Sequence, residues 1–99
     1  MVLSDGCFYA SKCLRPAVIL DIATLTGAQL IATGKNHAAL YCSCEELEAR
    51  ALGAGKYSGD LTFPVPYCPE FYRQEFRSTV ADMKNSVADR GNAQTSCGE

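Results

Sequence analysis

The segment AVILDIATLTGA, residues 17–28, constrains the fold more strongly than any other part of this sequence. It opens with an unbroken apolar run directly behind Pro16, and such a run is typical of a strand buried on both faces. The Thr-Leu-Thr-Gly that follows is typical of a turn and a helix start. We therefore expect a strand over residues 17–22 and a helix over 27–33. In open α/β sheets, ligands bind at the carboxyl ends of such strands, where the chain turns into the helix.

The rest of the pattern extends this α/β reading. A second apolar strand is expected about fifteen residues after the first, which leaves room for a right-handed parallel crossover. The fold class is therefore α/β, with three layers in which helices flank a mainly parallel sheet. The other expected elements are a helix over 2–14, the second strand over 37–41, a helix from a Ser43–Glu46 capping box to Gly53 and Gly55, a loop over 57–69, a short helix over 70–77, an extended piece from Val80, and a mobile tail over 84–99.

Length and charge limit the classes of function. With 99 residues, the chain forms one domain or a piece of one. Its net charge of −2 gives no reason to expect nucleic acid or an anionic membrane surface as a partner. The sequence has neither a long apolar span nor a basic-then-apolar leader, so we expect no membrane helix and a cytoplasmic address.

The cysteines leave a small metal or redox protein open as a possibility. Six cysteines could pair in a secreted chain, but a cytosolic location keeps thiols reduced. Cys42-Ser-Cys44 lacks the two-residue spacer of zinc and redox motifs, and His37 is the single histidine. We therefore interpret the cysteines as small buried or idle thiols; stoichiometric bound zinc would be needed to revive the metal hypothesis.

The acidic and basic residues that could suggest catalysis all have structural interpretations. Glutamates at a helix start are explained by the helix dipole, and side chains in loops commonly satisfy backbone groups. We accordingly expect no catalytic role for Asp5, Asp21, Glu45, Glu46, Glu48, Asp82, Lys84, Asn85 or Arg90.

Four motifs in order resemble the catalytic domain of the leucine (cytosol) aminopeptidase family. The resemblance covers almost the whole chain, and the run over 67–94 is especially similar to the family's probable aminopeptidase-like branch. The motifs are Met1-Val-Leu-Ser-Asp-Gly6, Asp21-Ile-Ala-Thr-Leu-Thr-Gly-Ala28, Phe63-Pro-Val-Pro66 and Ala81-Asp-Met-Lys-Asn85.

The resemblance implies an activity and a binding surface. Members of the family are cytoplasmic homo-hexamers that remove amino-terminal residues from peptides with two divalent metals, commonly manganese or zinc. Those metals polarise the scissile carbonyl and activate a bridging water. Thr24, Leu25 and Gly27 correspond to family positions that hydrogen-bond the peptide and shape the pocket for its first side chain.

The metal ligands and catalytic basic residues of the family have no counterpart in this sequence. In the family they lie upstream, partly in an Asn-Thr-Asp-Ala-Glu-Gly-Arg stretch that precedes the segment resembling residues 1–6. We therefore expect residues 1–99 to be an interior fragment of the catalytic domain, with no metal ligand, no catalytic residue and no activity alone. The alternative is a non-catalytic interaction fragment that aggregates or docks on full-length aminopeptidase subunits.

Overall fold

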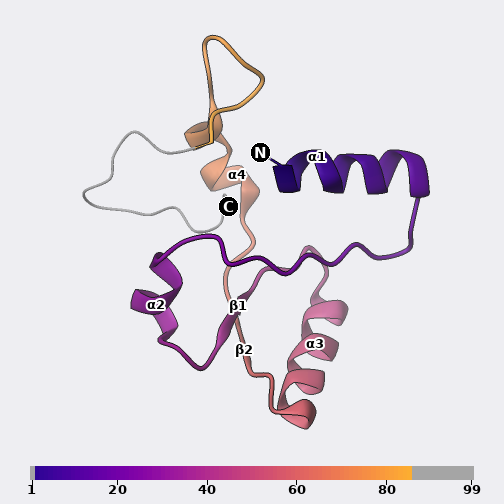
Figure 1. The fold of residues 1–99 in the computed structure, drawn as a ribbon, viewed down its shortest axis with the longest axis vertical. Helices are drawn as coiled ribbons and strands as arrows, with labels where there is room; N and C mark the ends of the chain where they lie inside the picture. Colours follow the sequence, from indigo (N-terminus) through magenta and orange to yellow (C-terminus); the bar gives the residue numbers. More distant parts are fainter. Residues whose placement is uncertain (1, 86–99) are drawn as a thin grey trace.

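The computed structural model of the protein describes residues 2–85, in which short helices surround a small sheet (Figure 1). The described part of the chain is flat, with extents of 45 × 37 × 22 Å. Its elements are α1 (Val2–Tyr9), the π-helical η1 (Ala10–Leu14), α2 (Ala28–Thr33), β1 (Ala38–Leu40), α3 (Glu45–Ser58), β2 (Thr62–Pro64), α4 (Pro69–Tyr72) and the 3₁₀-helical η2 (Arg73–Phe76).

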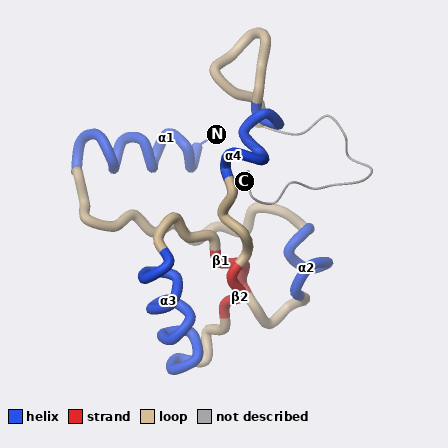
Figure 2. The backbone as a smooth tube through the Cα atoms, turned by 180° about the vertical axis from the view of Figure 1, so that it is seen from behind, coloured by secondary structure: helices blue, strands red, loops and turns tan. Residues whose placement is uncertain are grey.

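The sheet has two parallel strands, β1 and β2, and α3 connects them (Figure 2). Ala38 lies opposite Thr62, and Leu40 lies opposite Pro64. Backbone bonds of 3.0 Å extend the ladder at both ends, from Ala38 N–H to the Leu61 carbonyl and from Val65 N–H to the Leu40 carbonyl. The predicted strand over 37–41 is therefore confirmed as β1. The parallel crossover that we expected between residues 17–22 and this strand is not formed; the observed crossover joins β1 to β2 through α3.

The second strand of the sheet lies in the segment that we expected to be a loop. Pro64 ends β2, and proline cannot donate a ladder hydrogen bond. The ladder tolerates it because Val65 N–H donates to β1, which leaves the nitrogen of the preceding Pro64 on the opposite edge of the strand, away from β1. The prolines around this strand therefore limit its length to three residues without preventing it from pairing.

Two helices agree with their sequence signals. The predicted helix over 2–14 is formed by α1 and η1, and Arg15 leaves it in the left-handed conformation with φ of 47° directly before Pro16. Pro69 is the first residue of α4, the position where proline's missing N–H costs nothing. Both ends therefore depend on proline chemistry that is visible in the sequence.

The predicted strand over 17–22 is wrong for the described chain. No residue of this segment belongs to a strand, and within residues 2–85 the backbone of 17–25 makes no hydrogen bond. All of its apolar side chains are exposed, with Leu20 75% and Ile22 92% accessible. An apolar strand of this kind needs neighbours on both edges and both faces, and residues 2–85 do not supply them.

The predicted capping box and the predicted end of the third helix are also wrong. Cys44 is the N-cap residue of α3, and no side chain caps it. The helix continues through both internal glycines to Ser58 and ends at Gly59, whose φ of 85° permits the left-handed turn. Each internal glycine costs about 1 kcal/mol relative to alanine, so packing must compensate for it.

That packing occurs where α3 meets β2. Gly55 is the one buried residue among 2–85, and a Cβ atom there would lie 2.7 Å from the Asp60 carbonyl oxygen. The Thr62 hydroxyl is buried at the same contact and has no hydrogen-bond partner in the described structure. The glycine that we read as a helix stop is therefore needed for close approach of helix and strand.

A hydrophobic core is absent from the described residues, since none of their apolar side chains is buried. The accessible surface is 8295 Å². A folded protein of 10.6 kDa would expose about 5,500 Å².

Among residues 2–85 no helix is long and apolar enough to cross a membrane.

The end of the described chain differs from its prediction. Residues 79–82 form bends, so the extended piece expected from Val80 is wrong. The backbone N–H of Lys84 donates to the Phe76 carbonyl at 2.8 Å, which folds this loop back on η2. The prediction of a mobile tail falls, beyond Asn85, outside the described residues.

We predict opposite effects for alanine at the two internal glycines of α3. Gly55→Ala should destabilise the fold by about 1–3 kcal/mol, because the new Cβ would overlap backbone. Gly53→Ala, the matched control, has open space and should stabilise it by about 0.5–1 kcal/mol. Thermal unfolding followed by circular dichroism measures both; equal shifts would contradict the α3–β2 contact.

Candidate functional site

The three predicted substrate-binding residues lie on one short turn. Thr24 and Leu25 end the extended segment, and Gly27 is the N-cap residue of α2, with φ of −71° and ψ of −9°. All three are exposed. The described structure therefore brings them together in sequence and in space, and leaves their backbone accessible to a ligand.

A polar clamp holds the helix behind this turn. The Gln29 side-chain amide donates to the His37 carbonyl at 2.9 Å and also contacts the Thr33 hydroxyl. Thr33 donates to the same carbonyl at 3.2 Å. Since α2 is only six residues long, this clamp ties it to the chain that enters β1, and Gly34 makes the connection with a φ of 79°. Sequence reasoning missed Gln29, although its spacing of four from Thr33 places both side chains on one helix face.

The acidic and sulfur-containing residues do not form a metal site within residues 2–85. No group of three or more His, Cys, Asp or Glu side chains could hold an ion there. Asp5 on α1 and Asp21 in the extended segment are both exposed. Two adjacent divalent cations need several converging oxygen ligands, so the described donor set does not fit a dinuclear centre.

The cysteines among the described residues are free thiols. Cys42 donates from its Sγ to the Cys44 carbonyl at 3.2 Å. This contact within one turn accounts for the Cys42-Ser-Cys44 spacing without a metal.

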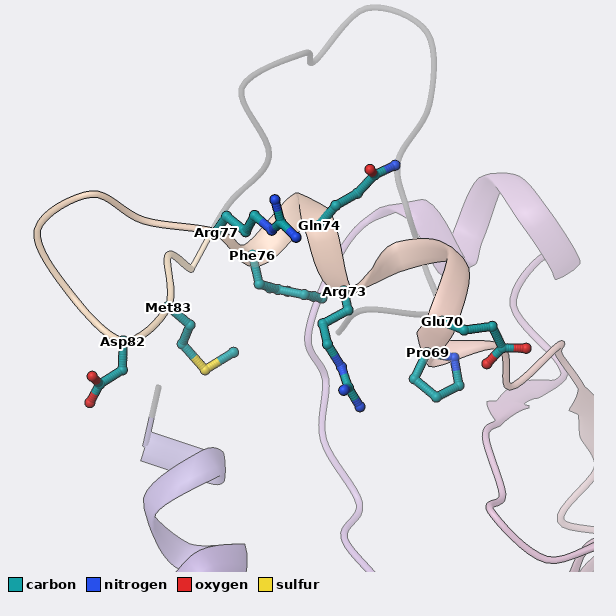
Figure 3. Close-up of a pocket in the computed structure, with 8 residues that line it drawn as sticks. All are labelled: Pro69, Glu70, Arg73, Gln74, Phe76, Arg77, Asp82 and Met83. Carbon is teal, nitrogen blue, oxygen red and sulfur yellow. The ribbon is translucent and has the colours of Figure 1, made fainter.

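A shallow basin of about 640 Å³ lies on α4, η2 and the following loop, and none of the predicted site residues lines it (Figure 3). Arg73 and Arg77 extend toward different sides of the helix, and the Asp82 carboxylate points away from both (Figure 3). Two acids and two arginines among the lining residues leave its charge balanced. The lining residues are Pro69, Glu70, Arg73, Gln74, Phe76, Arg77, Asp82 and Met83.

This basin lacks the convergence that a catalytic site requires. General acid–base catalysis or anion binding needs side chains aimed at one reacting position, and these diverge. Sequence reasoning did not identify the basin; the spacing of four between Arg73 and Arg77 was its only signal. Of the other residues considered from the sequence, Asp82 lines it and Arg90 lies outside the described residues.

A family model matches almost the whole chain. The model is described as "Cytosol aminopeptidase family, catalytic domain", and it matches residues 1–98. The human protein named Probable aminopeptidase NPEPL1 is 58% identical over 97 residues, which are 98% of this chain and 18% of that protein. Leucine aminopeptidase 1 of Caenorhabditis elegans is 44% identical over 86 residues, which are 87% of this chain and 18% of that protein.

Solved structures share the backbone arrangement as well. The apo structure of leucyl aminopeptidase from Trypanosoma brucei superposes with a TM-score of 0.88 at 52% identity, covering 98% of this chain and 20% of that one. The C. elegans leucine aminopeptidase structure gives a TM-score of 0.88 at 41% identity, covering 97% of this chain and 20% of that one. The chain therefore spans about a fifth of the length of the relatives that it matches.

The clamp generates a prediction about the turn. Gln29→Met keeps the side-chain length but removes the donor, and should cost about 0.5–1.5 kcal/mol through the lost hydrogen bonds. Hydrogen exchange at Ala38–Leu40 should accelerate, because the clamp anchors the residue before β1. Lys35→Ala, an exposed change in the same connection, should leave exchange unaltered. Identical exchange in both variants would rule out the clamp.

Proposed function

This chain belongs to the cytosol aminopeptidase family, and we propose that it forms the substrate-facing part of a catalytic domain that removes amino-terminal residues from peptides. The match over residues 1–98 is the observation that carries the proposal. Agreement of the backbone with leucyl aminopeptidase at a TM-score of 0.88 supports it. Sequence and structure thus point to the same part of the same domain.

The role proposed for this chain lies in its backbone. Thr24, Leu25 and Gly27 would receive the peptide, with exposed N–H and carbonyl groups in the turn before α2 forming its hydrogen bonds. The Gln29 clamp would hold that turn in place.

We further propose that the two metals, manganese or zinc, are held by residues outside these 99. The lack of a suitable ligand group in residues 2–85 supports this assignment. We propose likewise that the 99-residue chain has no catalytic residue of its own and is inactive alone.

The complete assembly is also part of the proposal. We place the chain in a three-layer α/β domain with a mainly parallel sheet, which the parallel β1–α3–β2 unit supports. By resemblance to the family, such domains would form cytoplasmic homo-hexamers that act on peptides.

A second candidate function is a non-catalytic interaction fragment that docks on full-length aminopeptidase subunits. The observation that favours it is the exposure of large apolar side chains along the described chain, including Ile22 and Ile31. Exposed apolar side chains, where they gather into a patch, are typical of interaction sites or of aggregation. Co-purification with a full-length relative would support docking, and a monodisperse monomer without binding would oppose it.

Leucyl-amide hydrolysis tests the proposed division of roles. The purified 99-residue chain with added Mn²⁺ should show no turnover above buffer, because its described residues offer no dinuclear ligand set. A full-length relative assayed in parallel provides the positive control. Turnover by the short chain that disappears with a chelator would contradict the proposal.

A further inference from the structure

The connection between β1 and α3 carries two thiols that play no part in the function proposed above. Cys42 lies two residues beyond the end of β1, and Cys44 is the N-cap residue of α3. Both thiols are free; Cys42 is half-buried and Cys44 is exposed. A reagent from solvent can therefore reach one thiol while the other stays partly sheltered in the same short connection.

A hydrogen bond fixes the direction of the Cys42 side chain. Its Sγ–H donates to the carbonyl oxygen of Cys44 at 3.2 Å. The same carbonyl accepts the Glu48 N–H at 3.0 Å, a bond of the first turn of α3. The helix thus holds the carbonyl, and the Cys42 thiol folds forward over Ser43 onto it. The sulfur of one cysteine is therefore kept next to the backbone that bears the other.

The backbone span between the two cysteines also suits a covalent link. The Cα atoms of disulfide-bonded residues are usually about 4.4–6.8 Å apart, and pairs beyond about 7 Å cannot be bridged without backbone movement. Two residues of fully extended chain span about 7 Å at most. The chain bends at Ser43, so the span from Cys42 to Cys44 is shorter than that limit. The bend therefore takes the place of the two-residue spacer of Cys-X-X-Cys redox motifs.

The other cysteines within residues 2–85 are placed differently. Cys7 and Cys13 lie six residues apart on the helical segment formed by α1 and η1, whereas side chains that meet on a helix are three or four residues apart. Cys68 is the N-cap residue of α4, in another connection. Among the described cysteines, local geometry therefore brings together Cys42 and Cys44.

Acidic side chains next to the pair favour ring closure over capture of a small thiol. Glu45, Glu46 and Glu48 occupy the first turn of α3, directly after Cys44. Glutathione carries net negative charge at neutral pH, so these carboxylates would repel a glutathione bound at Cys44. Attack by the neighbouring Cys42 relieves this repulsion. A mixed disulfide at this place is therefore an intermediate rather than an end point.

We propose that Cys42 and Cys44 are a modification site, poised by the bend at Ser43, at which a low-molecular-weight disulfide such as oxidised glutathione closes a reversible Cys42–Cys44 disulfide. The Cys44 thiolate attacks one sulfur of the oxidant, which forms a mixed disulfide and releases one glutathione thiolate. The Cys42 thiolate then attacks the Cys44 sulfur, which closes the ring and releases the second glutathione thiolate. The cysteines are oxidised by two electrons, the oxidant is reduced by the same two, and the cysteine protons end on the released glutathione.

Peptide mapping of the 99-residue chain tests the site. Trypsin cleaves after Lys35 and Arg50, so peptide 36–50 contains both cysteines, whereas each of the other four lies alone in its peptide. After treatment with oxidised glutathione, alkylation of the remaining thiols and digestion, peptide 36–50 should be about 2 Da lighter than its reduced form and carry no alkyl group. A peptide 36–50 that instead carries glutathione, or that stays reduced while another cysteine is modified, would overturn the proposal.

Serine variants separate ring closure from ordinary thiol reactivity. Cys42→Ser should stop at the mixed disulfide on Cys44, because no second thiol remains to displace the glutathione. Cys13→Ser, the matched control at an exposed cysteine on another element, should close the disulfide in peptide 36–50 at an unchanged rate. Loss of closure in Cys13→Ser would show that the disulfide arises by exchange through a different thiol, and would refute the site.

Concentrated urea tests the part that the fold plays. Closure should slow by about 3-fold or more once the Cys42 hydrogen bond and the bend are lost, since the two sulfurs are then no longer held together. The rate is followed as the appearance of the lighter form of peptide 36–50 in samples quenched with acid. Equal rates in urea and in buffer would contradict a pair poised by the structure.

Discussion

The close approach of α3 to β2 at Gly55 is the contact on which the rest of the described fold depends. It sets the helix against the strand so closely that a side chain at this position would meet the Asp60 carbonyl oxygen. The connection from β1 through α3 then returns in the direction that allows β2 to pair in parallel. No apolar side chain of residues 2–85 is buried, so the order of this unit depends on the close approach at Gly55 and on the backbone hydrogen bonds of the β1–β2 ladder.

The candidate site is connected to the β1–α3–β2 unit only indirectly. In the turn that bears Thr24, Leu25 and Gly27, neither Thr24 nor Leu25 makes a hydrogen bond to the sheet. Its position depends on α2, which Gln29 and Thr33 fasten to the carbonyl of His37 just before β1. The backbone of the turn can thus be held in position by the hydrogen bonds that Gln29 and Thr33 make from the adjoining helix.

Local chemistry explains which features could be predicted from the sequence. Pro69 at a helix start, the helix before Pro16 and the apolar strand at Ala38–Leu40 follow from proline geometry and periodicity. The family could also be recognised, because its motifs occur in order along the chain. Long-range packing explains what could not be predicted. Gly55 reads locally as a helix stop, and only the approach of β2 gives it another role.

The strand expected over 17–22 is a second case in which long-range packing could not be predicted from the local sequence. Its apolar pattern predicts burial, but all of these residues are exposed, because burial requires partners that residues 2–85 do not contain. Gln29 and the basin near Arg73 were missed because their significance depends on which segments meet in space.

The uncovered apolar segment also has a consequence for the life of the chain in a cell. Chaperones and proteases of the quality-control system act on chains that leave hydrophobic stretches open, and they continuously remove those that do not refold. As long as Leu20 and Ile22 face solvent, the segment is open to recognition by that system. Covering these side chains would remove that recognition signal, so the balance between burial and exposure of one short segment would affect how much of the chain persists.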